Sequence, residues 1–301
     1  MTDSIQNSKK SGAQWRTITA VGAATWLVTT QLSGCDSNRS IEEEAEGGPT
    51  LDQPLLNSEL GGEGEGEGEG GEGHGGEGEG EGTATDGAEF ATDDIASLTQ
   101  LGLIRGHLAV GHALYSNDLP GLAETHMKHP REEIYATVEG AFKPRGCDGF
   151  GDNLSALTAA VVGRESKANV DAVYAELTNA IATCEQGADT SDPKVAVTVI
   201  ENLLRTAGIE YEIGVVDGKM NNLHEYQDAW GFTRIADDLA KSEAFAGDPK
   251  ATAVAAQLQD LIAGLQPMWP SLNPEGTIAS ESAQLFGAAA QVQVIAFNLD
   301  R

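Results

Sequence analysis

The sequence predicts an all-α protein, a bundle of eight or nine helices in two similar hairpin sets that follows a segment unable to fold. Apolar residues recur at helical spacing from residue 92 onward, and strand signals are absent. Prolines and capping residues divide this pattern into helical lengths. Residues 1–91 look unlike globular protein, which leaves about 210 residues, ample for a buried core.

The first set is expected to begin with a helix from Thr92-Asp93-Asp94 to about Ser116. Its apolar stripe contains Leu101, Ile104, Leu108, Gly111 and Tyr115. Further helices are expected over about 121–128, 130–142, 152–164 and 168–186. Pro130 is expected to start its helix and to force His129 out of regular helical geometry.

The second set is expected to begin at Ser191-Asp192-Pro193 and to continue to Val216. Its apolar stripe contains Val199, Ile200, Leu203, Leu204, Ala207 and Tyr211. Helices over about 220–241, 250–265 and 277–298 complete the bundle, and Trp269 is expected to be exposed in the loop 267–274. Fourteen residues separate His112 from His126, and fourteen separate Glu210 from His224, which suggests two related halves.

The chain of 301 residues is strongly acidic, with a formal net charge of −29. Much of this charge lies between Asp36 and Glu89, but the remainder is also acidic. A negative surface repels phosphate backbones, and no basic stripe with interleaved aromatic residues is present, so we expect no binding of nucleic acid. Cationic partners or metal ions fit better.

The N-terminus carries Lys9, Lys10 and Arg16, then a mostly apolar or small segment over 17–31, then Leu32-Ser33-Gly34-Cys35. This pattern resembles a bacterial lipoprotein signal peptide. The resemblance implies cleavage after residue 34 and acylation of Cys35, so that membrane lipid holds the protein at the cell envelope, facing the periplasm or the surface. The alternative is a short transmembrane anchor, but about 15 apolar residues are too few to span a bilayer.

Residues 35–91 are predicted to form a disordered acidic tether. Residues 61–82 alternate glycine and glutamate almost perfectly. Glycine maximises chain entropy and the like charges repel, so this stretch should be extended and flexible. The domain boundaries expected are therefore 1–34 for the signal peptide, 35–91 for the tether and 92–301 for the helical domain.

Export would place Cys147 and Cys184 in an oxidising compartment, and with Cys35 acylated they are the two remaining cysteines. We expect a disulfide between them, and two separate buried thiols are the alternative.

Four of the six histidines lie between His107 and His129. His107 and His112 are five residues apart, about 140° around a helix, so they cannot share one face. Antiparallel packing would bring His112 and His126 to similar height, near His129 and Glu132 or Glu133. In the second half, Glu210 and His224, with Glu225 or Asp228, offer a comparable set. Imidazole and carboxylate ligands together suit iron, copper, zinc or nickel.

Each histidine also has a structural interpretation: His107 and His112 as core-edge residues, His126 as an exposed residue, and His129 as the residue before a proline that begins a helix. No phosphate-binding loop, dinucleotide fingerprint, nucleophile elbow or HExxH motif is present, so we do not expect an enzyme.

The combination of an exported helical protein, two similar halves and histidine–carboxylate motifs resembles the imelysin-like proteins, including the periplasmic iron-uptake lipoproteins. The signature of that family is Gly-x-His-x-x-Glu. This chain has Gly111-His112 and, separately, His129-Pro130-Arg131-Glu132, with Met127 where the signature has glycine. The resemblance covers residues 95–298 in architecture and implies metal binding linked to iron handling.

The sequence therefore predicts a membrane-tethered metal-binding lipoprotein. The ligands expected are His112, His126, His129 and Glu133 in the first half and Glu210 and His224 in the second half. The alternative is a non-catalytic helical module that binds a protein partner in the cell envelope.

Overall fold

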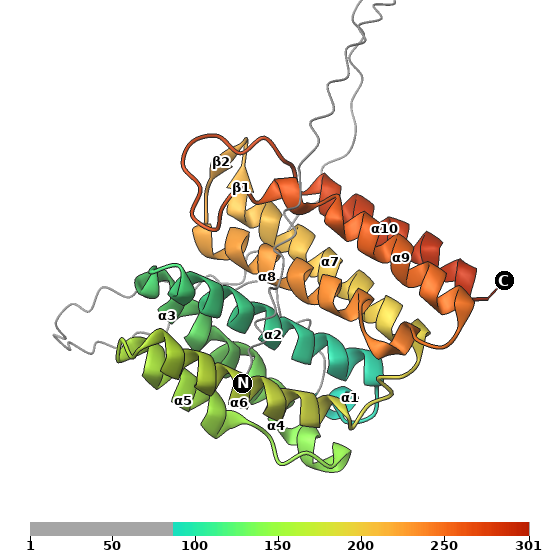
Figure 1. The fold of residues 1–301 in the computed structure, drawn as a ribbon, viewed down its shortest axis with the longest axis horizontal. Coiled ribbons are helices and arrows are strands. Elements are labelled where there is room, and N and C mark those ends of the chain that lie inside the picture. The colour runs from blue at the N-terminus through green and yellow to red at the C-terminus, as the bar shows by residue number, and fades with distance from the viewer. Residues whose placement is uncertain (1–86, 301) are drawn as a thin grey trace, which may run out of the picture. The chain divides into compact units, whose positions relative to one another are not determined.

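The structure, a computed structural model, describes residues 87–300 (Figure 1). The predicted signal peptide and nearly all of the predicted tether lie outside the described residues. Helical structure begins with the short helix α1 (Gly87–Phe90), within the stretch assigned to the tether. Phe90 is buried in the core, so the described body starts five residues before the boundary expected at residue 92.

The first set of helices has the expected order and closely matches the expected bounds. It comprises α2 (Asp94–Ser116), α3 (Pro120–His129), the π-helix η1 (Pro130–Tyr135), α4 (Ala136–Phe142), the 3₁₀-helix η2 (Lys143–Arg145), α5 (Gly151–Val162) and α6 (Lys167–Glu185). The side chain of Asp93 caps α2 by accepting from the backbone N–H groups of Ile95 and Ala96.

The second set also follows the prediction, with two differences. It comprises α7 (Pro193–Gly214), β1 (Val215–Val216), β2 (Lys219–Met220), α8 (Leu223–Ala240), the 3₁₀-helix η3 (Glu243–Phe245), α9 (Pro249–Ala263), the 3₁₀-helix η4 (Gln266–Met268), α10 (Ala283–Ala296) and the 3₁₀-helix η5 (Phe297–Leu299). The expectation that strands are absent was wrong in one place, because Asp217 and Gly218 have positive φ and close a short antiparallel hairpin. The last helix begins at Ala283, later than expected.

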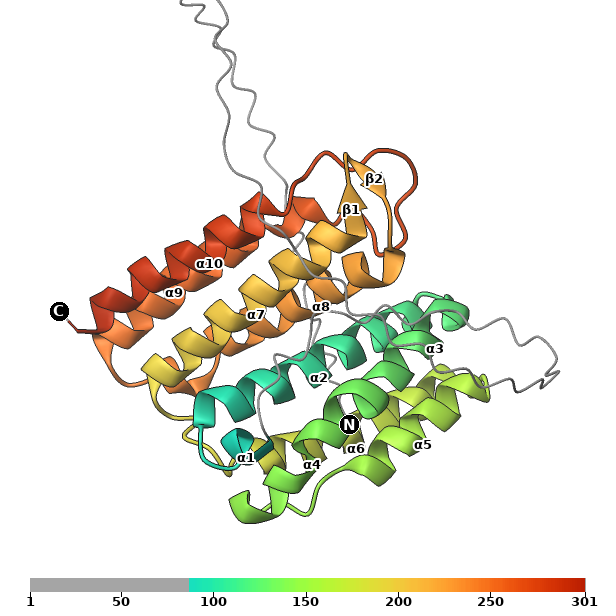
Figure 2. The same ribbon diagram turned by 180° about the vertical axis from the view of Figure 1, so that it is seen from behind.

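Helix α2 joins the two sets (Figures 1 and 2). It packs against α3 and α6 of its own set and against α7 and α8 of the second set. Helices α7 and α8 pack together, and α10 and α9 cover them on the side away from α2. Both helical sets therefore share one body, as the sequence predicted.

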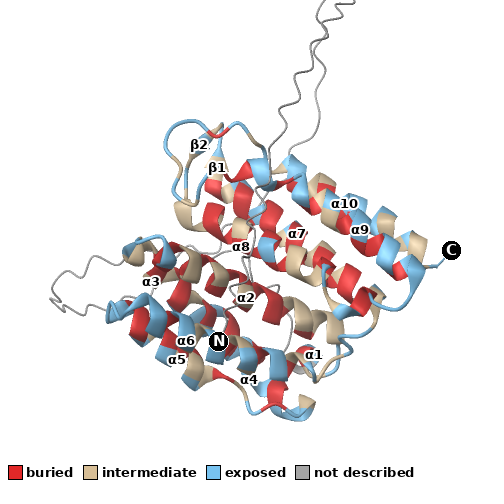
Figure 3. Ribbon diagram, in the orientation of Figure 1, coloured by how far each residue is buried: buried red, intermediate tan, exposed pale blue. Residues whose placement is uncertain are grey.

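The core follows the predicted stripes, and Figure 3 shows the buried residues gathered where α2, α7 and α8 face one another. Leu101, Ile104, Leu108 and Tyr115 of α2 are buried, and so is the whole predicted stripe of α7. Trp269 was wrongly expected to be exposed. It is 8% exposed, and its indole N–H donates to the backbone oxygen of Tyr226 at 3.1 Å.

The chain runs as a helix from α3 through η1 into α4 without a break at Pro130. His129 has φ −49° and ψ −49°, which are helical values. The prediction that Pro130 forces His129 out of the helix was wrong. Proline lacks the N–H that a regular turn requires, and here the helix widens into a π-turn directly after His129 and continues.

Two glycines allow α2 and α8 to approach closely. A Cβ atom at Gly231 would lie 2.4 Å from the backbone oxygen of Gly106, and a Cβ atom at Gly106 would lie 2.4 Å from the Phe232 ring. Neither position has room for a larger side chain. The crossing therefore sets the distance between the residues that α2 and α8 present next to it.

The predicted disulfide between Cys147 and Cys184 is present, with the two Cα atoms 5.0 Å apart. It ties the loop after η2 to the C-terminal end of α6. Nearby, the buried Arg145 donates to the backbone oxygens of Phe90 and Gly187 and pairs with Asp94 at 2.7 Å. One side chain thus joins α1, α2 and the loop after α6.

Among the described residues, no helix is both long enough and apolar enough to cross a membrane.

Candidate metal centre

Four histidines and one aspartate from three helices meet inside the body. Helix α2 supplies His107, α3 supplies His126 and His129, and α8 supplies His224 and Asp228. The ring centroids of His126 and His224 are 5.4 Å apart, and His107 lies 6.4 Å from His126 and 6.2 Å from His129. The two halves of the chain therefore contribute to a single cluster.

Asp228 is at the centre of the cluster and is 1% exposed. Its Oδ1 lies 2.8 Å from Nδ1 of His107 and 2.9 Å from Nδ1 of His126. Burial raises the pKa of Asp228, but attraction to these two histidines lowers it by more, so the pKa lies well below the ordinary range of aspartate. The cluster therefore contains a carboxylate that stays ionised and needs cationic partners.

Both ring nitrogens of the fully buried His126 are engaged by α8. Nε2 of Gln227 donates to the backbone oxygen of Leu272 at 2.7 Å, which turns Oε1 of Gln227 toward His126. His126 Nε2 lies 2.7 Å from this oxygen and donates to it, while Nδ1 faces Asp228. This ring is thereby held in one orientation.

His129 is partly accessible to solvent, with 29% of its side chain exposed. It is the last residue of α3, directly before the π-turn that contains Glu133. Nδ1 of His129 and Oε2 of Glu133 are 4.0 Å apart. The widened turn thus places a carboxylate beside His129 on the partly open side of the cluster.

His224 occupies the first turn of α8, where Asn222 caps the helix by accepting from the backbone N–H of His224. Burial lowers the pKa of His224, and repulsion from His126 and His129 lowers it further, although Asp228 opposes this effect. A histidine with a lowered pKa is neutral at pH 7 and keeps a lone pair that can bind a metal ion.

One nitrogen from His107, one nitrogen from His129 and one oxygen from Asp228 all lie within 4.8 Å of one another. Ligand atoms about 2.1 Å from one transition-metal ion lie no more than roughly 4.2 Å apart, so a small contraction would let all three bind the same ion. The residues present therefore fit a metal ion in both chemistry and spacing.

His112, one of the expected ligands, lies elsewhere. Nε2 of His112 is 2.7 Å from Asp171 of α6, and its ring stacks on Tyr174 at 4.2 Å. Glu210 of α7, expected as a ligand of the second half, is buried. His126, His129, Glu133 and His224 are the expected residues that the structure brings to this region.

Sequence reasoning left His107 out of the ligand set and gave Asp228 only as an alternative. His107 lies in the core beside Phe232, with ring centroids 5.2 Å apart. A usable signal was its position three residues after Ile104 and one before Leu108, which places it beside the apolar stripe rather than opposite it.

A family model described as the iron permease-associated 4-helix bundle domain matches residues 185–295. The match covers α7, α8 and α9 and nearly all of α10, and it includes His224 and Asp228. No curated protein and no solved structure gives a significant match to the chain. The second helical set is thus similar to a helical domain linked to iron uptake, and the helices that supply His107, His126 and His129 lie outside the matched residues.

Proposed function

We propose that this protein binds a transition-metal ion, iron above all, at the cluster formed by α2, α3 and α8, and serves in iron uptake at the bacterial cell envelope. The observation that carries the proposal is the convergence of His107, His129 and Asp228 within 4.8 Å. Three residues from three helices, two of them almost fully buried, form this group.

The donor set favours iron. Two histidines and one carboxylate with open positions form the ligand type typical of non-haem Fe(II) sites, and thiolates, which favour Zn(II) or Cu(I), are not among the residues that form this cluster. The similarity of residues 185–295 to an iron permease-associated domain supports the same metal. His224, whose pKa is lowered by burial, is a candidate for a fourth ligand, since its ring centroid lies 6.4 Å from that of His129.

In this proposal His126 positions the ligand Asp228 rather than binding the ion. Its two nitrogens are committed to Asp228 and Gln227, an arrangement that resembles the partners which orient ligands around bound metals. Glu133 lies beside His129 and would orient that ligand in the same way. The sequence predicted His126 as a metal ligand, whereas in this proposal it positions Asp228.

Lipid anchoring through Cys35 is part of the proposal and rests on the N-terminal sequence. An acylated cysteine would hold the helical body at a membrane surface, and residues 36–86 would act as a spacer. Mass spectrometry of the protein isolated from bacterial membranes tests this point, because a chain that keeps residues 1–34 and an unmodified Cys35 would contradict it.

The decisive experiment measures metal content and affinity of the purified chain with Fe(II), Zn(II) and Cu(II) by elemental analysis and titration calorimetry. His129→Ala removes a ligand at a partly exposed position, so we expect a folded protein whose Fe(II) affinity falls at least about tenfold. His112→Ala is the matched control, since His112 is also a helical histidine paired with an aspartate but lies outside the cluster.

We expect His112→Ala to bind as the natural chain does. Equal loss of metal in both variants, or no stoichiometric metal in the natural chain, would reject the proposed site. Circular dichroism of both variants identifies any loss that comes from unfolding.

A further inference from the structure

The outer face of α10 presents apolar side chains to solvent. Helix α10 lies at the edge of the second set, on the side away from α2 (Figures 1 and 2). Val294 is 65% exposed, and Phe297, at the start of η5, is 63% exposed. Among the described residues, these two are the most exposed of the large apolar side chains. Contiguous apolar surface of this kind marks a contact site.

The outward-facing residues of α10 form one stripe. Successive members are four, three, four and three residues apart, which is the spacing of a seam between paired helices. They are Ala283, Gly287, Ala290, Val294 and Phe297. At 100° per residue, the stripe centres opposite the buried Leu285 and Val292. Helix α10 therefore packs on the core with one face and carries a second apolar face outside.

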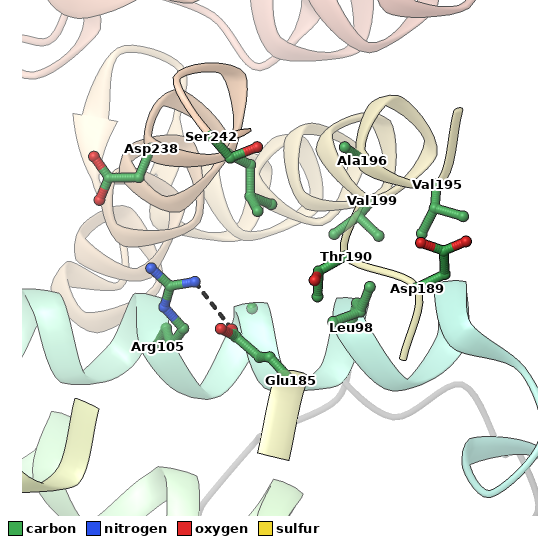
Figure 4. A pocket seen from close by; sticks show the side chains of 12 residues that line it. Leu98, Arg105, Glu185, Asp189, Thr190, Val195, Ala196, Val199, Asp238 and Ser242 are labelled. Atoms are coloured by element: carbon green, nitrogen blue, oxygen red, sulfur yellow. Dashed lines mark hydrogen bonds and ion pairs between the residues drawn. The ribbon is translucent and has the colours of Figure 1, made fainter. Parts of the chain in front are cut away.

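This stripe lies in a segment without charge. No charged residue lies between Ala283 and Leu299, although the chain has a formal net charge of −29. Charged side chains occur even where the two helical sets meet, since Arg105 pairs with Glu185 at 3.0 Å beside the cavity drawn in Figure 4. A charged partner surface would lose its hydration against α10 and gain no opposite charge in return. The surface that covers α10 must therefore be uncharged and apolar as well.

A second copy of α10 meets this requirement, and its side chains fit in size. In an antiparallel pair with a twofold axis at the height of Val292, Gly287 faces Phe297 of the second copy, and Ala290 faces its Val294. Each pair joins a small residue to a large one, which allows facing layers to interdigitate. A Cβ atom at Gly287 would meet nothing within 4 Å, so the space beside this glycine is open to the ring of the second copy.

We propose that two copies of this chain form an antiparallel, twofold-symmetric dimer through α10. The segment from Ala283 to Leu299 is about 25 Å long, and α7 and α9 both contact α10, so the second copy also meets their edges. The covered area is on the order of 1,000 Å², the lower limit for a specific interface, which gives a reversible dimer.

A lipid surface fits α10 less well, because helices that lie in a membrane interface carry Lys or Arg on their polar face and α10 has neither. The residues of the metal centre lie on α2, α3 and α8, so the dimer and the metal site can fail independently.

Sedimentation equilibrium of the purified full chain tests the dimer. Cys35→Ser keeps the chain free of lipid and is the parent for all variants. We expect a reversible equilibrium between monomer and dimer with a dissociation constant of about 1–100 µM. Association should become several-fold tighter between about 0.05 and 0.5 M NaCl, because salt screens the repulsion between two acidic copies.

Two substitutions on the stripe have matched controls elsewhere. Gly287→Gln fills the open space and should weaken association at least about tenfold. Gly140→Gln in α4 should stay within about twofold of the parent, since a Cβ atom there also meets nothing within 4 Å. Ala290→Glu places two like charges near the twofold axis and should give a monomer. Ala182→Glu, at an exposed position of α6, should still dimerise.

Oxidation of single-cysteine chains tests the antiparallel direction, because Cys147 and Cys184 are already joined. A mixture of Ala290→Cys and Val294→Cys chains should form a disulfide-linked pair. Ala283→Cys alone should not, since its two copies would lie about 27 Å apart along the helix axis.

A parent chain that stays monomeric up to about 200 µM overturns the dimer. Equal losses in Gly287→Gln and Gly140→Gln, or efficient crosslinking of Ala283→Cys alone, overturn it too. If a monomeric parent sediments with phosphatidylcholine vesicles and Gly287→Gln does not, the face binds lipid instead. Circular dichroism of each variant shows that the chains compared are folded.

Discussion

Gln227 shows how one buried side chain can orient the proposed centre. Its amide N–H group donates a hydrogen bond to the backbone oxygen of Leu272, and its amide oxygen accepts one from His126. The side chain therefore joins the loop before α10 to a histidine of α3. Because His126 in turn contacts Asp228, the position of the central carboxylate depends on Gln227, which is not among the proposed ligands.

Replacing Gln227 with leucine tests this dependence. The change leaves the N–H of His126 and the oxygen of Leu272 without their buried partner, so we expect a loss of about 1–3 kcal/mol in the free energy of unfolding. Metal affinity should also fall about 10–100-fold. Urea denaturation and metal titration measure the two effects, and Gln291→Leu at an exposed position of α10 should change neither.

At the scale of elements, the approach of α2 and α8 at Gly106 and Gly231 keeps His107 within 2.8 Å of Asp228. Gly106 directly precedes His107, and Gly231 follows Asp228 by three residues. A side chain at either position would push the helices apart and lengthen the contact that holds the carboxylate.

Gly231→Ala should therefore destabilise the protein by about 1–3 kcal/mol through overpacking and weaken metal binding at the same time. Gly140→Ala in α4 is the control, since a Cβ atom there meets nothing within 4 Å. We expect Gly140→Ala to stabilise the helix by about 0.5–1 kcal/mol. Thermal unfolding with and without Fe(II) separates the two variants, and unchanged stability in Gly231→Ala would contradict the close crossing.

Asp94, in the first turn of α2, makes a pH-dependent contribution to the free energy of unfolding. The pKa of Asp94 is lowered, mainly by its hydrogen bond with Arg145 and also by the backbone N–H of Asp189. A group with a lowered folded-state pKa stabilises the fold above its unfolded pKa of about 4, and this contribution is lost as the pH falls through the folded value. Asp94→Asn should be less stable than the natural chain at pH 7. The difference between their free energies of unfolding should become smaller below about pH 4.

Urea unfolding at pH 7 and at about pH 3 measures this gap. Asp152→Asn, in the first turn of α5, is the control for a general change of charge. A gap for Asp94→Asn that is constant with pH would show that the ion pair with Arg145 does not contribute.

At the scale of the molecule, two helical sets share a core, and the proposed centre is built from both. The disulfide between Cys147 and Cys184 closes a separation of 37 residues within the first set. It restricts the unfolded chain, so its loss should reduce the free energy of unfolding by about 2–4 kcal/mol. The double variant Cys147→Ser with Cys184→Ser, unfolded in urea beside the natural chain, measures this loss.

Addition of a reductant should lower the stability of the natural chain by a similar amount and leave the double variant unchanged. Metal affinity should stay within about twofold in the folded double variant, because neither cysteine contacts the cluster. A natural chain that is insensitive to reductant would show that the two cysteines are not joined in solution.

The architecture could be predicted because its signals are local. Stripes such as Leu101, Ile104 and Leu108 repeat at helical spacing, and caps such as Asp93 lie beside the helix they begin. Trp269 was misjudged because its burial depends on packing against Tyr211 and Tyr226, which lie far away in sequence. Residues 277–282 were taken for the start of the last helix, whereas α10 begins at Ala283.

The candidate centre could be predicted only in part. The density of histidines pointed to the stretch that supplies His107, His126 and His129, and spacing within one hairpin favoured His112. The choice between His107 and His112 depends on which helix lies against each face of α2. Helix α6 lies against His112, and α8 brings Asp228 to His107.

The sequence by itself determined the helical class, most helix bounds, the disulfide pair, the buried stripes and the types of ligand available. These follow from periodicity, capping and residue chemistry, which act over a few residues. Only the tertiary structure decided that α2 and α8 cross at two glycines, that residues of both halves meet at one cluster, and that His112 stands apart from it. Those outcomes depend on helix packing between residues about a hundred positions apart, which local pattern does not specify.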